Sequence, residues 1–162
     1  MKAYFKNIMH LLLIIILVIG HSGCKKDEAP DWERCTDCSL EQITGTYIGK
    51  ATLKEYDEES VLINTAHSDE AYLELSAFSN NSIGISVGVV NLFNASINAG
   101  WKSGEYTISS LSDGEFLAEI WRHGDQIKIK GINKRYSELV LENDSVVLVL
   151  RSLFDFEVIK TE

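Results

Sequence analysis

Apolar and polar residues alternate with a period of two along most of the chain after Gly45. The pattern is clearest in "TGTYIGKATLK", "EAYLELSAF", "SIGISVGVV" and "QIKIKG". Because successive side chains of a strand point to opposite faces, this period predicts half-buried β-strands and no long helix. Lys128 and Lys130 fall on the outward face. The residues expected to face inward are Tyr47, Gly49, Ala51, Leu53, Ala71, Leu73, Leu75, Ala77, Ile83, Ile85, Val87, Val89, Ile127 and Ile129.

Turn-forming residues separate these stretches at intervals close to the roughly 8–12 residues of an antiparallel meander. Short connections favour pairing between neighbours in sequence. We therefore predict an all-β domain built as an antiparallel meander of roughly eight to ten strands. Closure into a barrel removes both sheet edges, and a β-sandwich is the alternative. Before the first strand, "SLEQ" at Ser39–Gln42 matches a capping box and predicts a single helical turn.

One stretch departs from the alternation. Val146–Leu150 is apolar at every position, and Val140 interrupts the pattern of its own strand in the same way. A strand that is apolar on both faces is normally covered on both. We expect one face to lie inside the domain and the other to be covered by a loop, a second sheet, a partner or a ligand.

The N-terminus carries the signs of export. Lys2 and Lys6 precede an apolar run, "LLLIIILVI" at Leu11–Ile19. A transmembrane helix needs about 20 apolar residues, so this run is too short to span a bilayer. A positive segment, a short apolar segment and small residues around a cleavage point are typical of a signal peptide, here residues 1–23.

Cys24 follows this segment directly and suggests a lipoprotein signal rather than an ordinary secretory signal. With Gly23 before it, it resembles the lipobox of bacterial lipoproteins, although His21 stands where an aliphatic residue is usual. The resemblance implies that Cys24 receives a diacylglyceryl group and becomes the mature N-terminus. Two or more acyl chains hold a protein stably at a membrane, whereas one does not. The alternative is an ordinary secreted protein in which Cys24 is a thiol.

The next residues, Lys25, Lys26, Asp27 and Glu28, carry the second resemblance. A lysine followed by acids behind an acylated cysteine resembles the export signal of Bacteroidota lipoproteins. It implies an outer-membrane, lipid-anchored protein that faces the cell surface. The alternative is a solvated spacer on a lipoprotein that faces the periplasm.

The charge of the mature chain limits the class of partner that it can bind. Loss of residues 1–23 removes two of the 15 Lys+Arg and none of the 24 Asp+Glu, which leaves a net charge of −11. A nucleic-acid partner is therefore not expected, because it requires a basic surface. Residues 24–39, with the only proline, are predicted to be a flexible tether, and residues 40–162 the domain.

"CTDC" places Cys35 and Cys38 in the predicted tether. A redox dithiol would need a βαβ setting that this chain lacks. A metal site would need two more ligands, and the mature chain has only the distant His67 and His123. A local disulfide, or two thiols, in an oxidising compartment is the remaining interpretation.

The start of the first long strand resembles that of the lipocalins, in which Gly-x-Trp follows a short helical turn. Gly45 and Tyr47 occupy the matching positions, with tyrosine in place of tryptophan, and Arg151 is the candidate for the arginine that packs across that ring from the last strand. The resemblance implies a lipocalin-like barrel. Families of this kind bind small apolar molecules or proteins, and few are enzymes.

The sequence contains no recognisable catalytic motif. Nucleophilic catalysis would need a serine or cysteine near a histidine base, and the acids of "EYDEES" at Glu55–Ser60 fit a solvated hairpin tip. We predict no enzyme activity, no cofactor and no metal. The expected function is binding of a small apolar ligand within a membrane-anchored barrel. The alternative is a solid barrel or sandwich that contacts an envelope or host protein through Val146–Leu150.

Overall fold

A computed structural model describes residues 30–79, 82–101, 107–110, 114–141 and 144–161. All of them after Pro30 belong to a compact unit that begins at Asp31. The predicted signal peptide, Cys24 and the segment Lys25–Glu28 lie outside the described residues, so their roles stay predictions. Among the described residues, no helix is long and apolar enough to cross a membrane.

The described chain is almost entirely β-structure, as the alternation predicts. It forms nine strands and one helical turn. The elements in order are β1 (Glu33–Arg34), α2 (Leu40–Ile43), β2 (Gly45–Tyr56), β3 (Leu62–Ser79), β4 (Ser82–Val89), β5 (Phe93–Gly100), β6 (Thr107–Ser110), β7 (Gly114–His123), β8 (Gln126–Val140) and β9 (Val146–Lys160).

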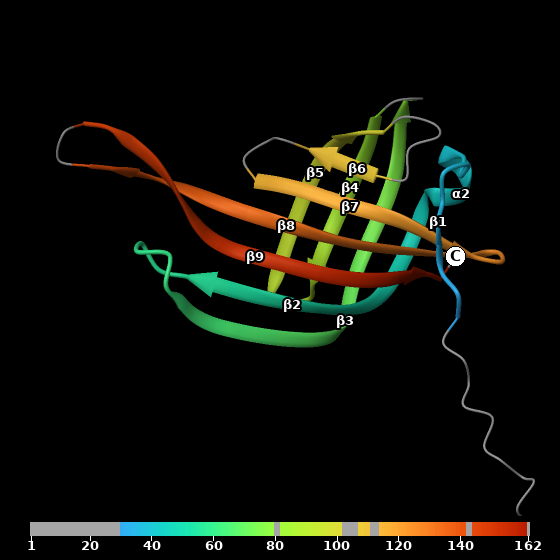
Figure 1. The fold of residues 1–162 in the computed structure, drawn as a ribbon, viewed down its shortest axis with the longest axis horizontal. Coiled ribbons are helices and arrows are strands. Elements are labelled where there is room, and N and C mark those ends of the chain that lie inside the picture. Colours follow the sequence, from blue (N-terminus) through green and yellow to red (C-terminus); the bar gives the residue numbers. More distant parts are fainter. Residues whose placement is uncertain (1–29, 80–81, 102–106, 111–113, 142–143, 162) are drawn as a thin grey trace, which may run out of the picture. The chain divides into compact units, whose positions relative to one another are not determined.

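The strands form one antiparallel sheet whose members are bonded in a ring. From β2 to β9 each strand pairs with the next, and β9 returns to pair with β2. The short β1 pairs with β7 at Arg122 and Trp121, beyond the part of β7 that pairs with β6. The predicted antiparallel meander is confirmed, and the closure is barrel-like (Figure 1).

The interior holds the side chains that the alternation assigned to it. Gly49 is half-buried, and Ala77 is exposed because it lies near the end of β3. The other assigned residues are buried, namely Tyr47, Ala51, Leu53, Ala71, Leu73, Leu75, Ile83, Ile85, Val87, Val89, Ile127 and Ile129. Period-two burial along each strand therefore builds one continuous apolar core.

The helical turn α2 is also as predicted. Ser39 caps it, accepting a hydrogen bond from the Gln42 N–H, while the Gln42 side chain accepts one from the Ser39 N–H. This reciprocal pair is the capping box. Ile43, at the end of the turn, is fully buried, so α2 closes part of the core.

Residues 31–38 differ from the predicted tether, because they pack on the sheet. We name them the N-terminal strap. The Cys35 N–H donates to the Ile120 carbonyl at 3.0 Å, and Cys35 and Cys38 form a buried disulfide. An apolar disulfide gains from leaving water, which draws this charged segment onto the domain. The compact unit thus begins at Asp31, ahead of the boundary expected at residue 40.

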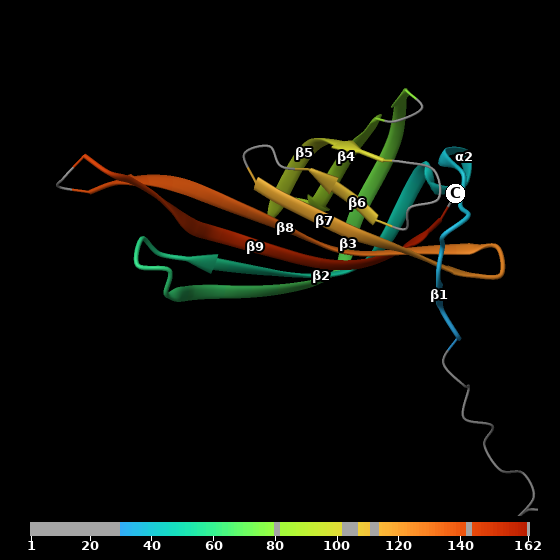
Figure 2. The same cartoon turned by 45° about the horizontal axis from the view of Figure 1, so that its top comes forward.

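The ring has two unlike ends. The proximal end holds the strap, α2, the β7–β8 turn and the end of β9, whereas the distal end holds the β2–β3, β4–β5 and β8–β9 turns. Strands β2, β3, β8 and β9 are the longest, and both views show them running past β4–β7 at the distal end (Figures 1 and 2). Two hairpins therefore project from the ring.

Candidate interaction surface

The lipocalin-like residues at the start of β2 are structural. Gly45 has a φ of +130°, a conformation that residues with a Cβ avoid. Tyr47 is fully buried, and its hydroxyl donates to the Ile43 carbonyl at the end of α2. Burial raises the pKa of Tyr47 well above its usual value. These contacts fix α2 across the proximal end.

Arg151 does not lie beside Tyr47. The residue of β9 opposite Tyr47 is Lys160, nine positions further on, which corresponds to roughly 30 Å along a strand. Lys160 Nζ donates to the Gln42 carbonyl at 2.7 Å, so the last-strand cation at α2 is a lysine. Arg151 instead forms an exposed ion pair with Glu58 at the distal end. The sequence offered only one arginine on this strand and no register to place it.

Aromatic rings fill the described interior. Phe154 stacks on Phe93 with centroids 4.5 Å apart and on Phe156 at 5.9 Å, and Phe116 extends the row. Gly49, one of the small residues expected to face inward, has no room for a side chain. A Cβ at Gly49 would lie 2.2 Å from a backbone oxygen of β9, so this glycine serves a close approach of two strands.

One polar group interrupts the aromatic interior. Asn133 is 3% exposed, and its Oδ1 accepts no hydrogen bond in the described structure. The neighbouring Arg135, two residues along β8, lies over the Phe93 ring with its guanidinium 4.4 Å from the centroid, and donates to the Asn94 carbonyl. A cation and a buried amide thus lie at the distal mouth of the ring.

Lys128 lies on the outward face, as the alternation predicts, and is nevertheless buried. Trp32 of the strap covers it, with the ring centroid 4.0 Å from Nζ. Burial lowers the pKa of Lys128, and Lys130 acts in the same direction. The sequence could not reveal this contact, because Trp32 and Lys128 are distant in the chain. Lys128 is buried by Trp32, and no residue near Lys128 in the sequence indicates this.

Glu157 balances the charge beside the strap. It accepts from Lys130 at 2.9 Å and lies 3.9 Å from Lys128. Burial alone would raise the pKa of Glu157, but the hydrogen bond from Lys130 and the charges of the surrounding lysines lower it overall. Within this cluster, Lys128 is the residue that contacts the strap, through the ring of Trp32.

Large apolar side chains are exposed mainly at the distal end. Among the described residues, ten of the fifteen exposed large apolar side chains lie on its hairpins. We name this set the distal apolar surface. Its members are Val61, Leu62, Ile63, Val90, Leu92, Val140, Leu141, Val146, Val147 and Leu148.

Val146–Leu150, the run that is apolar on both faces, contributes the central part of the distal apolar surface. Val149 is buried, but Leu148 is 69% exposed and Val146 55%. The expected cover over the second face is therefore absent from the described residues at these positions. Val61, Leu62 and Ile63 on the β2–β3 hairpin were not assigned a role from the sequence, although three consecutive apolar residues beside an acidic turn are a usable signal.

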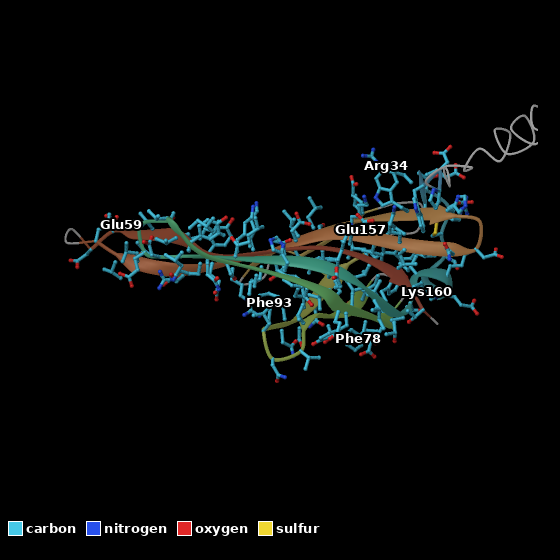
Figure 3. All side chains as sticks on the ribbon, turned by 90° about the horizontal axis from the view of Figure 1, so that it is seen from below. Arg34, Glu59, Phe78, Phe93, Glu157 and Lys160 are labelled. Carbon is cyan, nitrogen blue, oxygen red and sulfur yellow. A yellow bond between two sulfur atoms is a disulfide. The ribbon has the colours of Figure 1, made fainter. Side chains whose placement is uncertain are left out.

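Charged residues border this surface. The Asp57 side chain accepts from the N–H groups of Glu59 and Val61, both at 2.9 Å, which shapes the β2–β3 turn. Glu58 pairs with Arg151 at 3.6 Å and so links the two hairpins. Figure 3 places Glu59 at the end of the ribbon opposite Arg34 and Lys160.

The other sequence candidates do not form a reactive group. His67 Nδ1 and Thr52 Oγ1 share a hydrogen bond of 3.0 Å on the outer face, while His123 Nδ1 lies 3.1 Å from the Asp31 carbonyl oxygen at the proximal end. Within the described ranges, no three His, Cys, Asp or Glu side chains gather as metal ligands.

Comparison of the chain with protein-family models, with curated protein sequences and with solved structures gave no match. The case for a function therefore depends on the geometry of the distal apolar surface.

Proposed function

We propose that the protein is a membrane-anchored binding module in which a lipocalin-like β-barrel presents its distal apolar surface to another protein of the cell envelope. The distal apolar surface carries this proposal. Contiguous exposed apolar side chains on a soluble domain mark a site of interaction, because each would otherwise be buried in the core. Here eight of the ten lie on the two hairpins that extend past the ring, and Val90 and Leu92 lie on the β4–β5 turn at the same end.

The placement of the surface supports a role away from the anchor. The chain enters the compact unit at Asp31, at the proximal end, so a lipid on Cys24 would join the protein there. From Lys160 to Val146, β9 covers 15 residues, or roughly 50 Å. The distal apolar surface is thus separated by about the length of β9 from the end of the ring at which the described chain begins.

Charge supports a protein rather than a lipid as the occupant. Asp57, Glu58 and Glu59 form the turn beside the exposed Val61–Ile63. Acidic side chains at the border of an apolar surface are repelled by anionic lipid headgroups. A protein surface with cationic side chains beside its apolar centre complements them, and Arg151 stands in this way beside Val146–Leu150.

A lipocalin-like interior ligand is the second candidate, and Asn133 favours it. Its buried Oδ1 has no donor in the described structure, and a buried acceptor without a partner destabilises a fold. A small, largely apolar ligand with one donor group would satisfy it. The stacked rings of Phe93, Phe154 and Phe156 leave this candidate with less support than the exterior surface.

Site-specific photo-crosslinking in cells tests the proposal. A photoreactive residue at Ile63, on the distal hairpin, is compared with one at Phe78, at the proximal end of β3. The two side chains are matched in exposure, at 65% and 68%. We expect discrete protein adducts at position 63 and none at position 78. Equal labelling at both positions, or none at 63, would contradict the proposal.

Native mass spectrometry of the protein extracted from its own envelope separates the second candidate from the first. A retained small molecule that is lost in an Asn133→Leu variant would favour the interior ligand. A protein that carries no small molecule would leave the exterior surface as the binding site.

A further inference from the structure

β9 projects from the ring with an edge that has no strand beside it. Pairing with β2 ends at Ser152, and among the described strands Val146–Arg151 has a neighbour only on the β8 side. No described strand therefore pairs with the backbone donors and acceptors along this edge. Natural sheets protect such edges with charged side chains, proline or a covering segment. Val146–Leu150 contains no charge and no proline.

The other projecting edges in the described structure are protected. The part of β3 before Ala71 has no partner on its β4 side, but it bears His67, Asp69 and Glu70. The projecting part of β8, after Arg135, bears Glu138. Charged side chains on an edge strand oppose the approach of a further strand. Among these projecting edges, that of β9 is thus the one suited to accept another strand, while β5, which pairs with β6 only at Gly100, has its open edge within the ring.

Charges of opposite sign stand at the two ends of the uncharged run. Asp144 precedes it, and Arg151, which also forms the exposed ion pair with Glu58 of its own chain, follows it. If two copies of β9 pair antiparallel about Leu148, Arg151 of each falls opposite Ser145 of the other and next to its Asp144. The run is therefore self-complementary in charge as well as in apolar character, at both ends at once.

We propose that the occupant of this part of the distal apolar surface is a second copy of the chain, joined by antiparallel pairing of the two β9 edges about Leu148. The inference rests on the proposed function, because it names the partner of the same surface. Pairing joins the two projecting ribbons into one four-stranded sheet. It satisfies the open backbone groups and covers Val146 and Leu148 of both copies. Anchoring in one membrane raises the effective concentration of the two copies.

Cysteine cross-linking of the full chain in its membrane tests this pairing. In the proposed register the two Leu148 Cα atoms are directly opposed, about 4.5–5.5 Å apart, which is within disulfide range. Val140 is the matched control, since it is 64% exposed against 69% for Leu148 and lies on the same hairpin. It is on β8, so the two copies of Val140 are separated by three strand spacings, about 14 Å.

Under a mild oxidant, we expect Leu148→Cys to give a reducible dimer at least ten-fold more abundant than that of Val140→Cys or the unsubstituted chain. Arg151→Asp added to Leu148→Cys should lower the yield several-fold, because it sets acids against Asp144. Exchange of both charges, Asp144→Arg with Arg151→Asp, should restore it.

Equal cross-linking of Leu148→Cys and Val140→Cys would overturn the pairing, as would a charge exchange that fails to restore it. A disulfide from position 148 to a different protein would overturn the second copy as the occupant and leave the proposed function standing. The absence of adducts both here and at Ile63 in photo-crosslinking would overturn the inference and the proposed function together.

Discussion

The proximal and distal ends are built from the same strands, but apolar side chains are mainly covered at the proximal end and exposed at the distal end. At the proximal end the N-terminal strap and α2 cover the sheet, and even a lysine, Lys128, is buried under Trp32. At the distal end no element of the described chain covers the hairpins, and Leu148 and Ile63 are exposed. A single strand, β9, passes from one condition to the other.

The difference lies in what surrounds the strand and not in its composition. Phe154 and Phe156 of β9 are buried, whereas Val146–Leu148, equally apolar, are exposed. Burial stabilises a fold in proportion to the apolar area removed from water. The apolar residues at the distal end therefore contribute little to the stability of the isolated protein, and their area is available for association.

The largest expected effect contrasts these two parts of β9. Phe154→Ala removes a ring that is stacked on two others, and should lower the free energy of unfolding by about 3–5 kcal/mol. Leu148→Ala, on the same strand, should change it by no more than about 0.5 kcal/mol. Urea unfolding of the purified protein measures both. Similar losses in the two variants would show that the distal end is part of the core.

A smaller effect is expected from releasing the N-terminal strap. Cys35→Ala combined with Cys38→Ala opens a short disulfide loop and should cost about 2 kcal/mol, on the loop-entropy estimate. Because Trp32 is held beside this loop, its fluorescence should move toward that of an exposed indole. Unchanged stability would mean that the strap adds nothing to the packing of the proximal end.

The smallest effect concerns pH. The lysines hold the pKa of Glu157 below its usual value, so its contribution is present above the unfolded pKa of about 4.3 and is lost as pH falls through the folded pKa. Glu157→Gln should lower stability at neutral pH by up to about 1 kcal/mol and reduce the loss on acidification. Glu74→Gln, on an exposed part of β3, is the control, and a Glu157 variant with its acid sensitivity unchanged would contradict the assignment.

Much of the ring could be predicted from local patterns. The alternation in residues 45–54, the turn signals and the capping box at Ser39 all depend on neighbours a few residues apart. The burial of Lys128 and the position of Arg151 could not be predicted, because both depend on long-range register between strands. The packing of the strap could not be predicted either, because its charged residues are typical of a flexible tether. It depends on the Cys35–Cys38 disulfide and on the hydrogen bond from Cys35 to Ile120 of β7.

The distal apolar surface was anticipated only in part. Val146–Leu150 was recognised as apolar on both faces, which pointed to a cover or a partner. The sequence of Val61–Ile63 indicates only an uncertain strand, and nothing in it shows that these side chains are exposed. The alternation could not show that β2, β3, β8 and β9 extend beyond the other strands at the same end of the ring. That depends on where the neighbouring strands end, which the alternation within one strand does not indicate.

Thiol protection tests the central claim most directly. Ile63→Cys and Phe78→Cys are each treated with N-ethylmaleimide in the intact envelope and again after purification, with the unsubstituted chain as background. The two positions should react at similar rates in the purified, dilute protein. In the envelope, we expect position 63 to react at least ten-fold more slowly while position 78 is unchanged. Equal reactivity of both positions in the envelope would contradict a distal end that is covered by a partner.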